Sequence, residues 1–197
     1  PIIQEIQKFK RKIPISVDTV KPKVARLSLE NGASLLNDIS GFHNEEMIDL
    51  AKSFKCHLCV MHMQNSPKTM QVNPSYEKGV VTEIIRFFQE KVNELLKKGI
   101  EKDKIILDPG IGFGKSVEDN LDIIRNIETF KALGFPLLFG ISRKSFMGKI
   151  LNKKPKDLLP STLVLDMLLT IKHIDIIRAH DIEEHRDLIE LIRKIYP

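Results

Sequence analysis

The sequence has 197 residues, of which 42% are hydrophobic and 29% are charged, and its formal net charge is +5. These values favour one globular domain and exclude a disordered tail, a collagen-like repeat and a disulfide-rich miniprotein. No apolar run approaches the roughly 18 residues that a membrane-spanning helix needs, so we expect no transmembrane segment. The basic residues are spread along the chain, which suits an enzyme that handles anions as well as a nucleic-acid-binding protein.

Six short apolar runs alternate with helical patterns along the chain. The runs show little polar alternation, which is typical of strands covered on both faces of a parallel sheet. Residues 1–12 are typical of the end of a further helix. We predict the six strands at residues 13–17, 34–36, 58–61, 105–107, 137–141 and 174–177.

The segments between these runs carry the signals of amphipathic helices. The first full helix is predicted to begin near Pro22. Apolar residues at helical spacing between positions 81 and 96 predict a longer helix that ends at Gly99. Ser116 is a predicted N-cap, and Asp181 is predicted to open the last helix.

Alternating strands and helices predict a parallel α/β fold. A doubly wound sheet would usually carry a G-x-G-x-x-G turn after its first strand, and none follows Val17. We therefore favour a (β/α)8 TIM-type barrel that fills residues 1–197 and lacks its first two strands, with the doubly wound sheet as the alternative. The sequence begins with Pro1 and has no initiator methionine, so we expect it to be the later part of a longer chain.

Two cysteines, Cys56 and Cys59, form a C-x-x-C pattern inside an apolar run. Residues three apart on a strand point to opposite faces, so the two thiols would not converge on a metal ion. We predict two inert core thiols. Reduced thiols of this kind suit a cytoplasmic protein.

Two connections between predicted elements stand out. The segment from Gln64 to Ser75 is long for a strand–helix connection, contains Pro67, and is a candidate mobile lid. The turn that begins at Asp108 reads DPGIGFGK, but its glycine spacing does not match a phosphate loop of the Walker A type. Its glycines favour a close approach of the backbone to a flat ligand, to which Phe113 offers a ring.

Each predicted strand ends in polar residues, and the active site of a parallel barrel lies at those ends. Carboxylates and an amide can bind a heterocycle with several N–H groups, whereas arginine, lysine and histidine can hold an anion. Capping of the next helix is the alternative for Asp38, and a core position is the alternative for His62. The six strand ends are Asp18-Thr19, Asn37-Asp38, His62-Met63-Gln64, Asp108-Pro109-Gly110, Ser142-Arg143-Lys144-Ser145 and Arg178-Ala179-His180-Asp181.

The cationic residues of the last two strand ends predict an anion site. Arg143 and Lys144 precede a helix start, where positive charge opposes the helix dipole unless an anion binds there. Arg178 and His180 are two residues apart, so a strand would place both side chains on one face. The last strand of a barrel is a usual location for a phosphate site. A structural ion pair is the alternative for these cations.

Together these motifs resemble those of the dihydropteroate synthase family, one of the pterin-binding enzyme families. They occur in the family's order and cover nearly the whole chain. The motifs that carry the resemblance are Ile15-Ser16-Val17-Asp18-Thr19, Asn37-Asp38-Ile39, Met61-His62-Met63-Gln64, Pro67-Lys68-Thr69-Met70, the turn from Asp108 to Lys115, Ser142-Arg143-Lys144-Ser145, and Ile177-Arg178-Ala179-His180-Asp181.

The resemblance implies a pterin-binding (β/α)8 barrel that condenses 6-hydroxymethyl-7,8-dihydropterin pyrophosphate with 4-aminobenzoate, giving dihydropteroate and pyrophosphate. It also implies a cytoplasmic homodimer that has no nucleic-acid or membrane partner. The implied cofactor is Mg²⁺, whose family ligand lies upstream of residue 1, so the resemblance assigns no metal ligand to this chain. A chain without the family's first strand and second loop is not expected to be active alone.

The resemblance also implies roles for individual residues. Asp108 and Lys144 are implied in catalysis. The pterin side comprises Asp18, Asn37, Asp108 and Lys144. The pyrophosphate side comprises Arg178, Ala179 and His180, and the aminobenzoate side comprises Phe113, Arg143 and Ser145. The alternatives are a methyltetrahydrofolate- or pterin-binding methyltransferase domain, a non-catalytic pterin-binding paralogue, and a metal-dependent hydrolase that uses His62, Asp108 and His180.

Overall fold

A computed structural model gives the structure of the chain and describes residues 2–9, 13–64, 69–70 and 74–196. Part of the predicted lid, including Pro67, lies outside these residues. The chain divides into two compact units, the first formed by residues 1–63 and 85–108 and the second by residues 64–84 and 109–197. Each unit is described by itself below.

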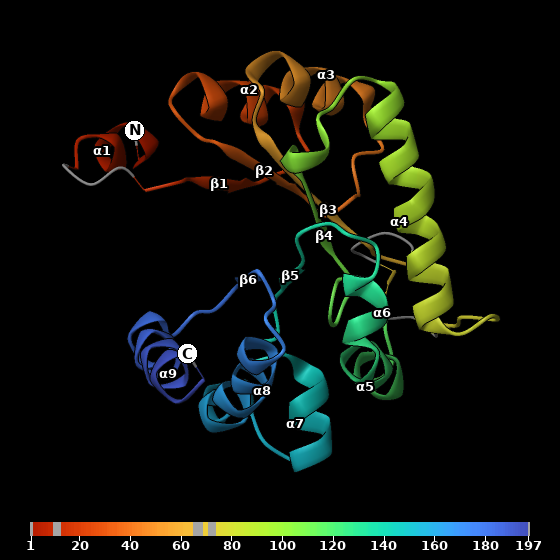
Figure 1. Ribbon diagram of the computed structural model, residues 1–197, viewed down its shortest axis with the longest axis vertical. Coiled ribbons are helices and arrows are strands. Elements are labelled where there is room, and N and C mark those ends of the chain that lie inside the picture. The colour runs from red at the N-terminus through yellow and green to blue at the C-terminus, as the bar shows by residue number, and fades with distance from the viewer. Residues whose placement is uncertain (1, 10–12, 65–68, 71–73, 197) are drawn as a thin grey trace. The chain divides into compact units, whose positions relative to one another are not determined.

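A parallel sheet of four strands forms the centre of the first unit (Figure 1). Its strands lie side by side in chain order, and every neighbouring pair is parallel. They are β1 (Ser16–Asp18), β2 (Leu35–Asp38), β3 (His57–Met61) and β4 (Ile105–Asp108). Because parallel strands point the same way, the carboxyl ends of all four meet at one edge of this sheet.

The helices of the first unit cover the apolar strands. Two of them, α2 and α3, lie on the same side of the sheet (Figure 1). Leu36, Leu58 and Leu107 of the strands have no exposed surface, so the core lies on the sheet. The helical elements of this unit are α1 (Ile2–Gln7), α2 (Pro22–Glu30), α3 (Glu45–Phe54) and the short 3-10 helix η1 (Lys102–Lys104).

The long helix α4 (Val80–Lys97) is the helix that the sequence predicts between positions 81 and 96. It has residues in both units. Its apolar stripe is buried, with Phe88 and Leu95 fully covered. Gly99 follows the helix with a φ of +86°, and the amide of Ile100 donates to the carbonyl of Leu95. Glycine ends the helix there because it enters the left-handed region without steric cost.

The second unit combines a pair of parallel strands with five helices among its described residues. Its core includes Phe130, Phe139 and Leu169, which have no exposed surface. Helices α8 and α9 pack side by side (Figure 1). The elements are α5 (Val117–Arg125), α6 (Ile127–Lys131), β5 (Leu138–Phe139), α7 (Ser145–Leu151), the 3-10 helix η2 (Pro155–Asp157), α8 (Leu159–Ile171), β6 (Ile176–Ile177) and α9 (Ile182–Ile195).

The parallel strands with intervening helices confirm the predicted α/β class. The predicted N-cap at Ser116 is confirmed, because its side chain and that of Asp119 form a reciprocal capping box. The helix that follows breaks at Asn126, whose side-chain amide donates to the carbonyl of Asp122. Within the described ranges, no helix is both long and apolar enough to cross a membrane.

Candidate functional site

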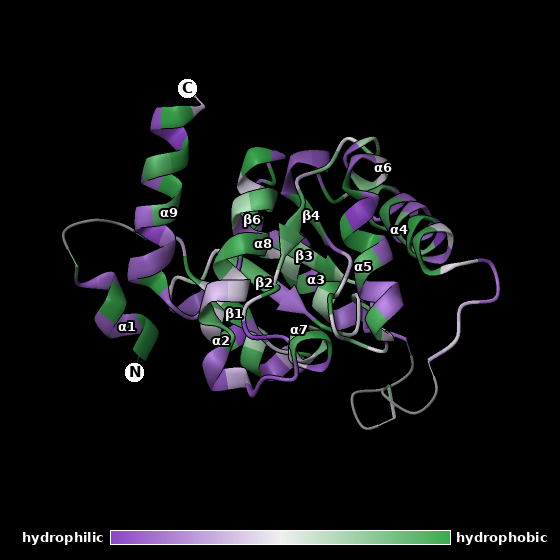
Figure 2. Cartoon of the chain, turned by 90° about the horizontal axis from the view of Figure 1, so that it is seen from below, coloured by the Kyte–Doolittle hydropathy of each residue, from purple (hydrophilic) through white to green (hydrophobic). Residues whose placement is uncertain are grey.

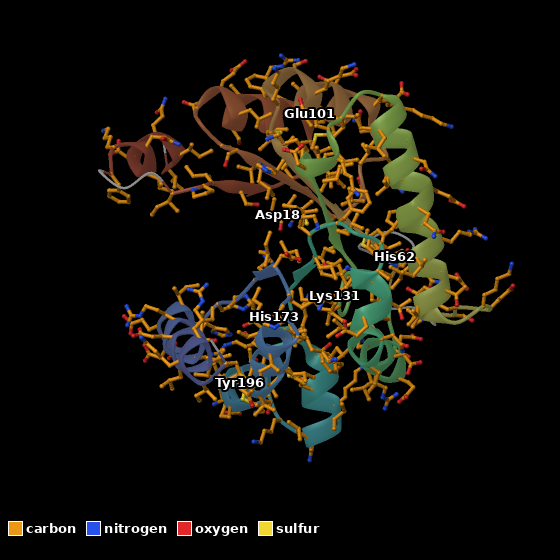
Figure 3. All side chains as sticks on the ribbon, in the orientation of Figure 1. Asp18, His62, Glu101, Lys131, His173 and Tyr196 are labelled. Atoms are coloured by element: carbon orange, nitrogen blue, oxygen red, sulfur yellow. The ribbon has the colours of Figure 1, made fainter. Side chains whose placement is uncertain are left out.

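Three of the predicted pterin residues share one face of the four-stranded sheet. Asp18 of β1 pairs with Asn37 of β2, and Asn37 pairs with Cys59 of β3. Cys59 in turn pairs with Ile106 of β4, and Asp108 lies two residues further along that strand. Paired residues of parallel strands, and residues two apart on one strand, point to the same face. Asp18, Asn37 and Asp108 therefore lie on one face near the carboxyl edge, where Figure 3 labels Asp18.

This face presents acceptor atoms: Asn37 and Asp108 are largely buried, whereas Asp18 is exposed. Asn37 is 7% exposed and Asp108 is 6% exposed. The side-chain amide of Asn37 donates to Oδ2 of Asp18 at 3.4 Å. Oδ1 of Asn37 is buried and has no hydrogen-bond partner among the described residues. A buried acceptor without a donor is costly, so this atom is suited to accept an N–H group from a ligand.

Asp38 has a structural contact on the opposite face from Asn37. Its Oδ1 accepts hydrogen bonds from the backbone amide and the hydroxyl of Ser40, at 2.7 and 2.6 Å. The cap of α3 is Asn44, whose side chain accepts from the amide of Glu46. Asp38 therefore stabilises the turn after β2 and does not cap the helix.

His62, just after β3, packs in the first unit (Figure 3). Its side chain is buried, and its ring lies edge-on to the ring of Phe87 on α4, with 5.2 Å between the ring centroids. This geometry is an aromatic packing contact. It favours the core position that the sequence left open for His62.

Both cysteines, which lie in the described part of the chain, are free and buried. Burial raises the pKa of the Cys56 thiol to about 11. A thiol with that pKa is neutral at physiological pH and is a poor nucleophile and a poor metal ligand. The prediction of two core thiols is confirmed.

In the second unit, the glycine-rich turn brings Phe113 and Lys144 together. Nζ of Lys144 lies 4.1 Å from the centroid of the Phe113 ring, which is the geometry of a cation–π contact. A Cβ atom at Gly112 would lie 3.2 Å from Cδ of Lys144, so glycine leaves room for the lysine stem. The amide of Gly112 donates to Oδ1 of Asn120 at 2.6 Å, which anchors the turn to α5.

Two residues without a sequence-based role also hold this turn. The phenol of Tyr76 donates to the carbonyl of Gly114 at 2.7 Å, and Nζ of the buried Lys115 donates to the carbonyl of Phe113 at 2.9 Å. Burial, followed by the nearby carboxylate of Asp119, raises the pKa of Tyr76, so the phenol remains a donor. A lysine inside a glycine-rich turn is the sequence signal that could have identified Lys115.

Arg143 forms the structural ion pair that the sequence left as an alternative. Its Nη2 and Nε donate to the two carboxylate oxygens of Asp181 at 2.6 and 2.9 Å. Its Nη1 donates to the carbonyl of Lys156 at 2.9 Å. The hydrogen bonds from Arg143 hold the pKa of Asp181 below its ordinary value. Ser145, the first residue of α7, is exposed.

The predicted pyrophosphate residues follow β6. The amide of Arg178 donates to the carbonyl of Phe139, so the pairing of β5 and β6 extends one residue past β6. Nδ1 of His180 lies 2.8 Å from the hydroxyl of Ser142. Arg178 and His180, which flank Ala179 in the sequence, are both exposed. The structure thus links the end of β6 with the end of β5.

Sequence reasoning missed a buried pair formed by Asp166 on α8 and His185 on α9. Asp166 is fully buried and His185 is 5% exposed. Nε2 of His185 lies 2.7 Å from Oδ2 of Asp166, and Nδ1 lies 2.6 Å from the carbonyl oxygen of Asp181. A single carboxylate inside the apolar sequence of α8 is the signal that could have identified this pair.

The side chains in the described part of the chain do not form a metal site. A metal ion needs several ligands at one place, and no group of three or more His, Cys, Asp or Glu residues gathers there. Neither unit therefore shows a metal site among its own described residues. The described residues also give no set that fits the Mg²⁺ ion implied by the resemblance.

Comparison with known proteins finds matches over most of the chain. A family model described as "Pterin binding enzyme" matches residues 1–180. Dihydropteroate synthase of Escherichia coli (strain K12) is 38% identical over 185 residues, which cover 93% of this chain. The chain spans 64% of the length of that relative.

Two solved structures of dihydropteroate synthase from Thermus thermophilus are similar to this chain. The complex with 4-aminobenzoate has a TM-score of 0.88 and 35% identity, covering 93% of this chain and 71% of that one. The complex with 6HMPPP has a TM-score of 0.92 and 33% identity, covering 100% of this chain and 77% of that one. The chain therefore belongs to the pterin binding enzyme family, within its dihydropteroate synthase members.

Proposed function

We propose that the protein joins 6-hydroxymethyl-7,8-dihydropterin pyrophosphate to 4-aminobenzoate, which yields dihydropteroate and pyrophosphate for folate biosynthesis. Family membership supports this reaction, as do the ligands named for the Thermus thermophilus structures. The observation that carries the proposal is the shared face of Asp18, Asn37 and Asp108, with a buried acceptor on Asn37. A dihydropterin offers the N–H donors that such a face needs.

The chemistry of the proposed reaction requires no protein nucleophile. The bond between the pterin methylene carbon and the pyrophosphate oxygen breaks, and its electron pair leaves with the pyrophosphate. The amine of 4-aminobenzoate gives its lone pair to the methylene carbon, forms the new C–N bond, and then loses a proton to solvent. Positive charge that develops on the dihydropterin is stabilised by a carboxylate such as Asp108, and the leaving charge is stabilised by cationic donors.

We assign residues of each unit to parts of the substrates. In the first unit, Asp18, Asn37 and Asp108 bind the pterin, and Asp108 is also catalytic. In the second unit, Lys144 binds the pterin and acts in catalysis. Arg178, His180 and the backbone of Ala179 bind the pyrophosphate. Phe113, Arg143 and Ser145 lie on the aminobenzoate side, where the ion pair with Asp181 gives Arg143 a supporting role.

We also propose that these strands belong to a (β/α)8 barrel whose first two strands lie outside this sequence. The outer edge of β6 has no strand partner among the described residues. A groove of about 730 Å³ runs beside it, lined by apolar side chains that include Ile177, Ile182 and Ile189. Exposed strand edges and apolar grooves are usually covered in a folded protein, which supports two further strands there.

The protein is further proposed to be a cytoplasmic homodimer. Helix α8 is largely hydrophobic (Figure 2), yet Val164 is 60% exposed and Met167 is 42% exposed. A helix that is apolar on all sides is normally buried against a partner, which supports pairing through this helix. Mg²⁺ remains part of the proposal as a cofactor, but no residue of this chain is assigned to it.

The test is isothermal titration of the full-length protein with a non-reactive analogue of dihydropterin pyrophosphate. We expect binding that Asp108→Ala abolishes or greatly weakens, because the variant removes an acceptor from the pterin face. A matched control is Asp103→Ala in η1, whose side chain is 71% exposed. No binding by the wild type, or identical binding by Asp108→Ala, would contradict the proposal.

An activity assay separates the proposed enzyme from its alternatives. The full-length protein should form dihydropteroate from both substrates. Pterin binding without product would instead identify a non-catalytic paralogue, and methyl transfer to or from a bound folate would identify a methyltransferase domain.

A further inference from the structure

The buried pair of Asp166 and His185 is not among the residues assigned to substrate, and its geometry fixes where protons must be. A backbone carbonyl only accepts hydrogen bonds, so Nδ1 of His185 must carry the hydrogen that faces the oxygen of Asp181 at 2.6 Å. Nε2 and Oδ2 of Asp166 are 2.7 Å apart, and two lone pairs would repel at that distance. One further proton therefore lies between His185 and Asp166.

The surroundings of the pair favour this extra proton. Burial opposes a charge on His185, but the hydrogen bonds to the carbonyl of Asp181 and to Asp166 outweigh it and raise the pKa of His185. Burial also raises the pKa of Asp166. Two carboxylates act on His185: that of Asp166 on α8 and that of Asp181, which precedes α9 and pairs with Arg143. The charged residues of α9 that line a groove together with His185 are Arg186, Glu190, Arg193 and Lys194.

The pair contacts one cationic strand end of the second unit and is linked through it to the other. The carbonyl that His185 holds belongs to Asp181, and the carboxylate of Asp181 holds the guanidinium of Arg143. The amide of Arg143 donates to the hydroxyl of Thr162 on α8 at 3.0 Å, so this strand end is also anchored to the helix that carries Asp166. Residues 142–145 and 178–181 are thus held by one network of hydrogen bonds.

We propose that Asp166 and His185 are positioning residues, which hold the segment 178–181 and, through Asp181 and Arg143, the segment 142–145 in the arrangement that binds a diphosphate. Neither residue touches substrate in this assignment. The inference rests on the proposed function, because it takes these two segments as the pyrophosphate and aminobenzoate side of the site. It adds two residues, a carboxylate and an imidazole, to the machinery of that reaction.

The experiment compares substitutions that keep or remove the hydrogen bond. In Asp166→Asn the new amide can donate to Nε2 of a neutral imidazole, which still donates to Asp181 through Nδ1, so the geometry is kept. Asp166→Leu cannot bond to His185. Asp166→Leu combined with His185→Leu removes both polar groups and leaves neither buried without a partner, so it protects the fold. Asp187→Asn, an exposed change on α9 that does not line the groove, is the control.

The readout is titration of the full-length protein with inorganic pyrophosphate, beside thermal unfolding of each variant. Wild type, Asp166→Asn and Asp187→Asn should bind alike at neutral pH. The leucine variants should bind about tenfold more weakly, the scale on which misplaced supporting groups act. Loss of the shared proton as pH rises should weaken pyrophosphate binding by the wild type. Asp166→Asn has no shared proton to lose, so its pyrophosphate affinity should not show this fall.

The outcomes separate this inference from the proposed function. If the folded double leucine variant binds pyrophosphate as the wild type does, the positioning role is wrong and the proposed function stands. The positioning role is also wrong if Asp166→Asn and Asp166→Leu lose the same affinity, because packing and not the hydrogen bond would then matter. If the wild type binds neither pyrophosphate nor the pterin analogue, the proposed function is wrong and the positioning role falls with it.

Discussion

Lys144 stands just before α7, where the helix dipole disfavours a positive charge, and its ammonium group lies over the ring of Phe113. We predict that Lys144→Ala weakens binding of a dihydropterin pyrophosphate analogue by about 1–3 kcal/mol, because a charge-assisted bond to the ligand is lost. Titration calorimetry on the full-length protein measures this. Lys149→Ala, an exposed change on α7, should leave affinity unchanged. A drop in thermal stability with full affinity would mean that Lys144 is structural.

The ion pair between Arg143 and Asp181 predicts a pH dependence of stability. The pKa of Asp181 is below its ordinary value of 3.8 in the folded protein, chiefly through the hydrogen bonds from Arg143. The stability it contributes is therefore complete above pH 3.8 and is lost as pH falls through the lowered folded pKa. The free energy of unfolding of Asp181→Asn should be below that of the wild type at neutral pH, and the difference should shrink on acidification.

Urea unfolding at a series of pH values measures that difference. Asp187→Asn is the control, because its carboxylate on α9 is 67% exposed and its contact with Arg186 is a surface pair. This variant should stay close to the wild type throughout. A stability gap for Asp181→Asn that is the same in acid as at neutral pH would contradict the prediction.

At the scale of elements, the glycine-rich turn depends on one close approach of the chain to itself. Gly114 has a φ of +62°, and a Cβ atom there would lie 2.8 Å from the carbonyl oxygen of Gln64. Gly79 has a φ of +81°, but nothing lies within 4 Å of the corresponding Cβ position. Gly79→Ala should cost about 1–2 kcal/mol for the left-handed backbone, and Gly114→Ala should cost more because the clash is added.

Chemical denaturation of the two glycine variants makes the comparison direct, since they share the backbone cost and differ in the clash. Gly114→Ala should also disturb the hydrogen bond from Tyr76 to the carbonyl of residue 114. Equal losses of stability would show that the turn relaxes around the added methyl group.

The elements could be predicted from the sequence, but their exact bounds could not. The apolar run at residues 13–17 indicates a strand, yet β1 begins only at Ser16, where the backbone first pairs with Leu35. Hydrophobicity reports burial, whereas a strand is defined by its neighbour, and that neighbour is distant in sequence. For the same reason β5 and β6 are each only two residues long, although the sequence predicts strands at 137–141 and 174–177.

The same limit applies to the candidate site. Asp18, Asn37 and Asp108 could be predicted because strand ends meet at one edge whatever the details of packing. The ion pair of Arg143 could not, because its partner is 38 residues away, and neither could the contact of Asp166 with His185, which are 19 residues apart.

At the scale of the whole molecule, the proposed homodimer depends on the outer face of α8. The double variant Val164→Glu, Met167→Glu places two charges on that face and should convert a dimer into a folded monomer, because burying unpaired charges is strongly unfavourable. Sedimentation equilibrium gives the mass. Phe54→Glu on α3, a partly exposed apolar-to-acidic change, should leave the dimer intact. A monomeric wild type, or a variant that remains dimeric, would contradict pairing through α8.

The two buried thiols allow local unfolding of the first unit to be measured by alkylation. Cys56 is 5% exposed with a pKa of about 11, and Cys59 has no exposed surface, so iodoacetamide cannot alkylate either one while β3 stays in its sheet. Alkylation therefore requires the sheet to open. The alkylation rate reports the opening equilibrium when the sheet recloses faster than the reagent reacts, and the opening rate when it recloses more slowly. The native protein thus carries its own reporter of local unfolding, without any engineered probe.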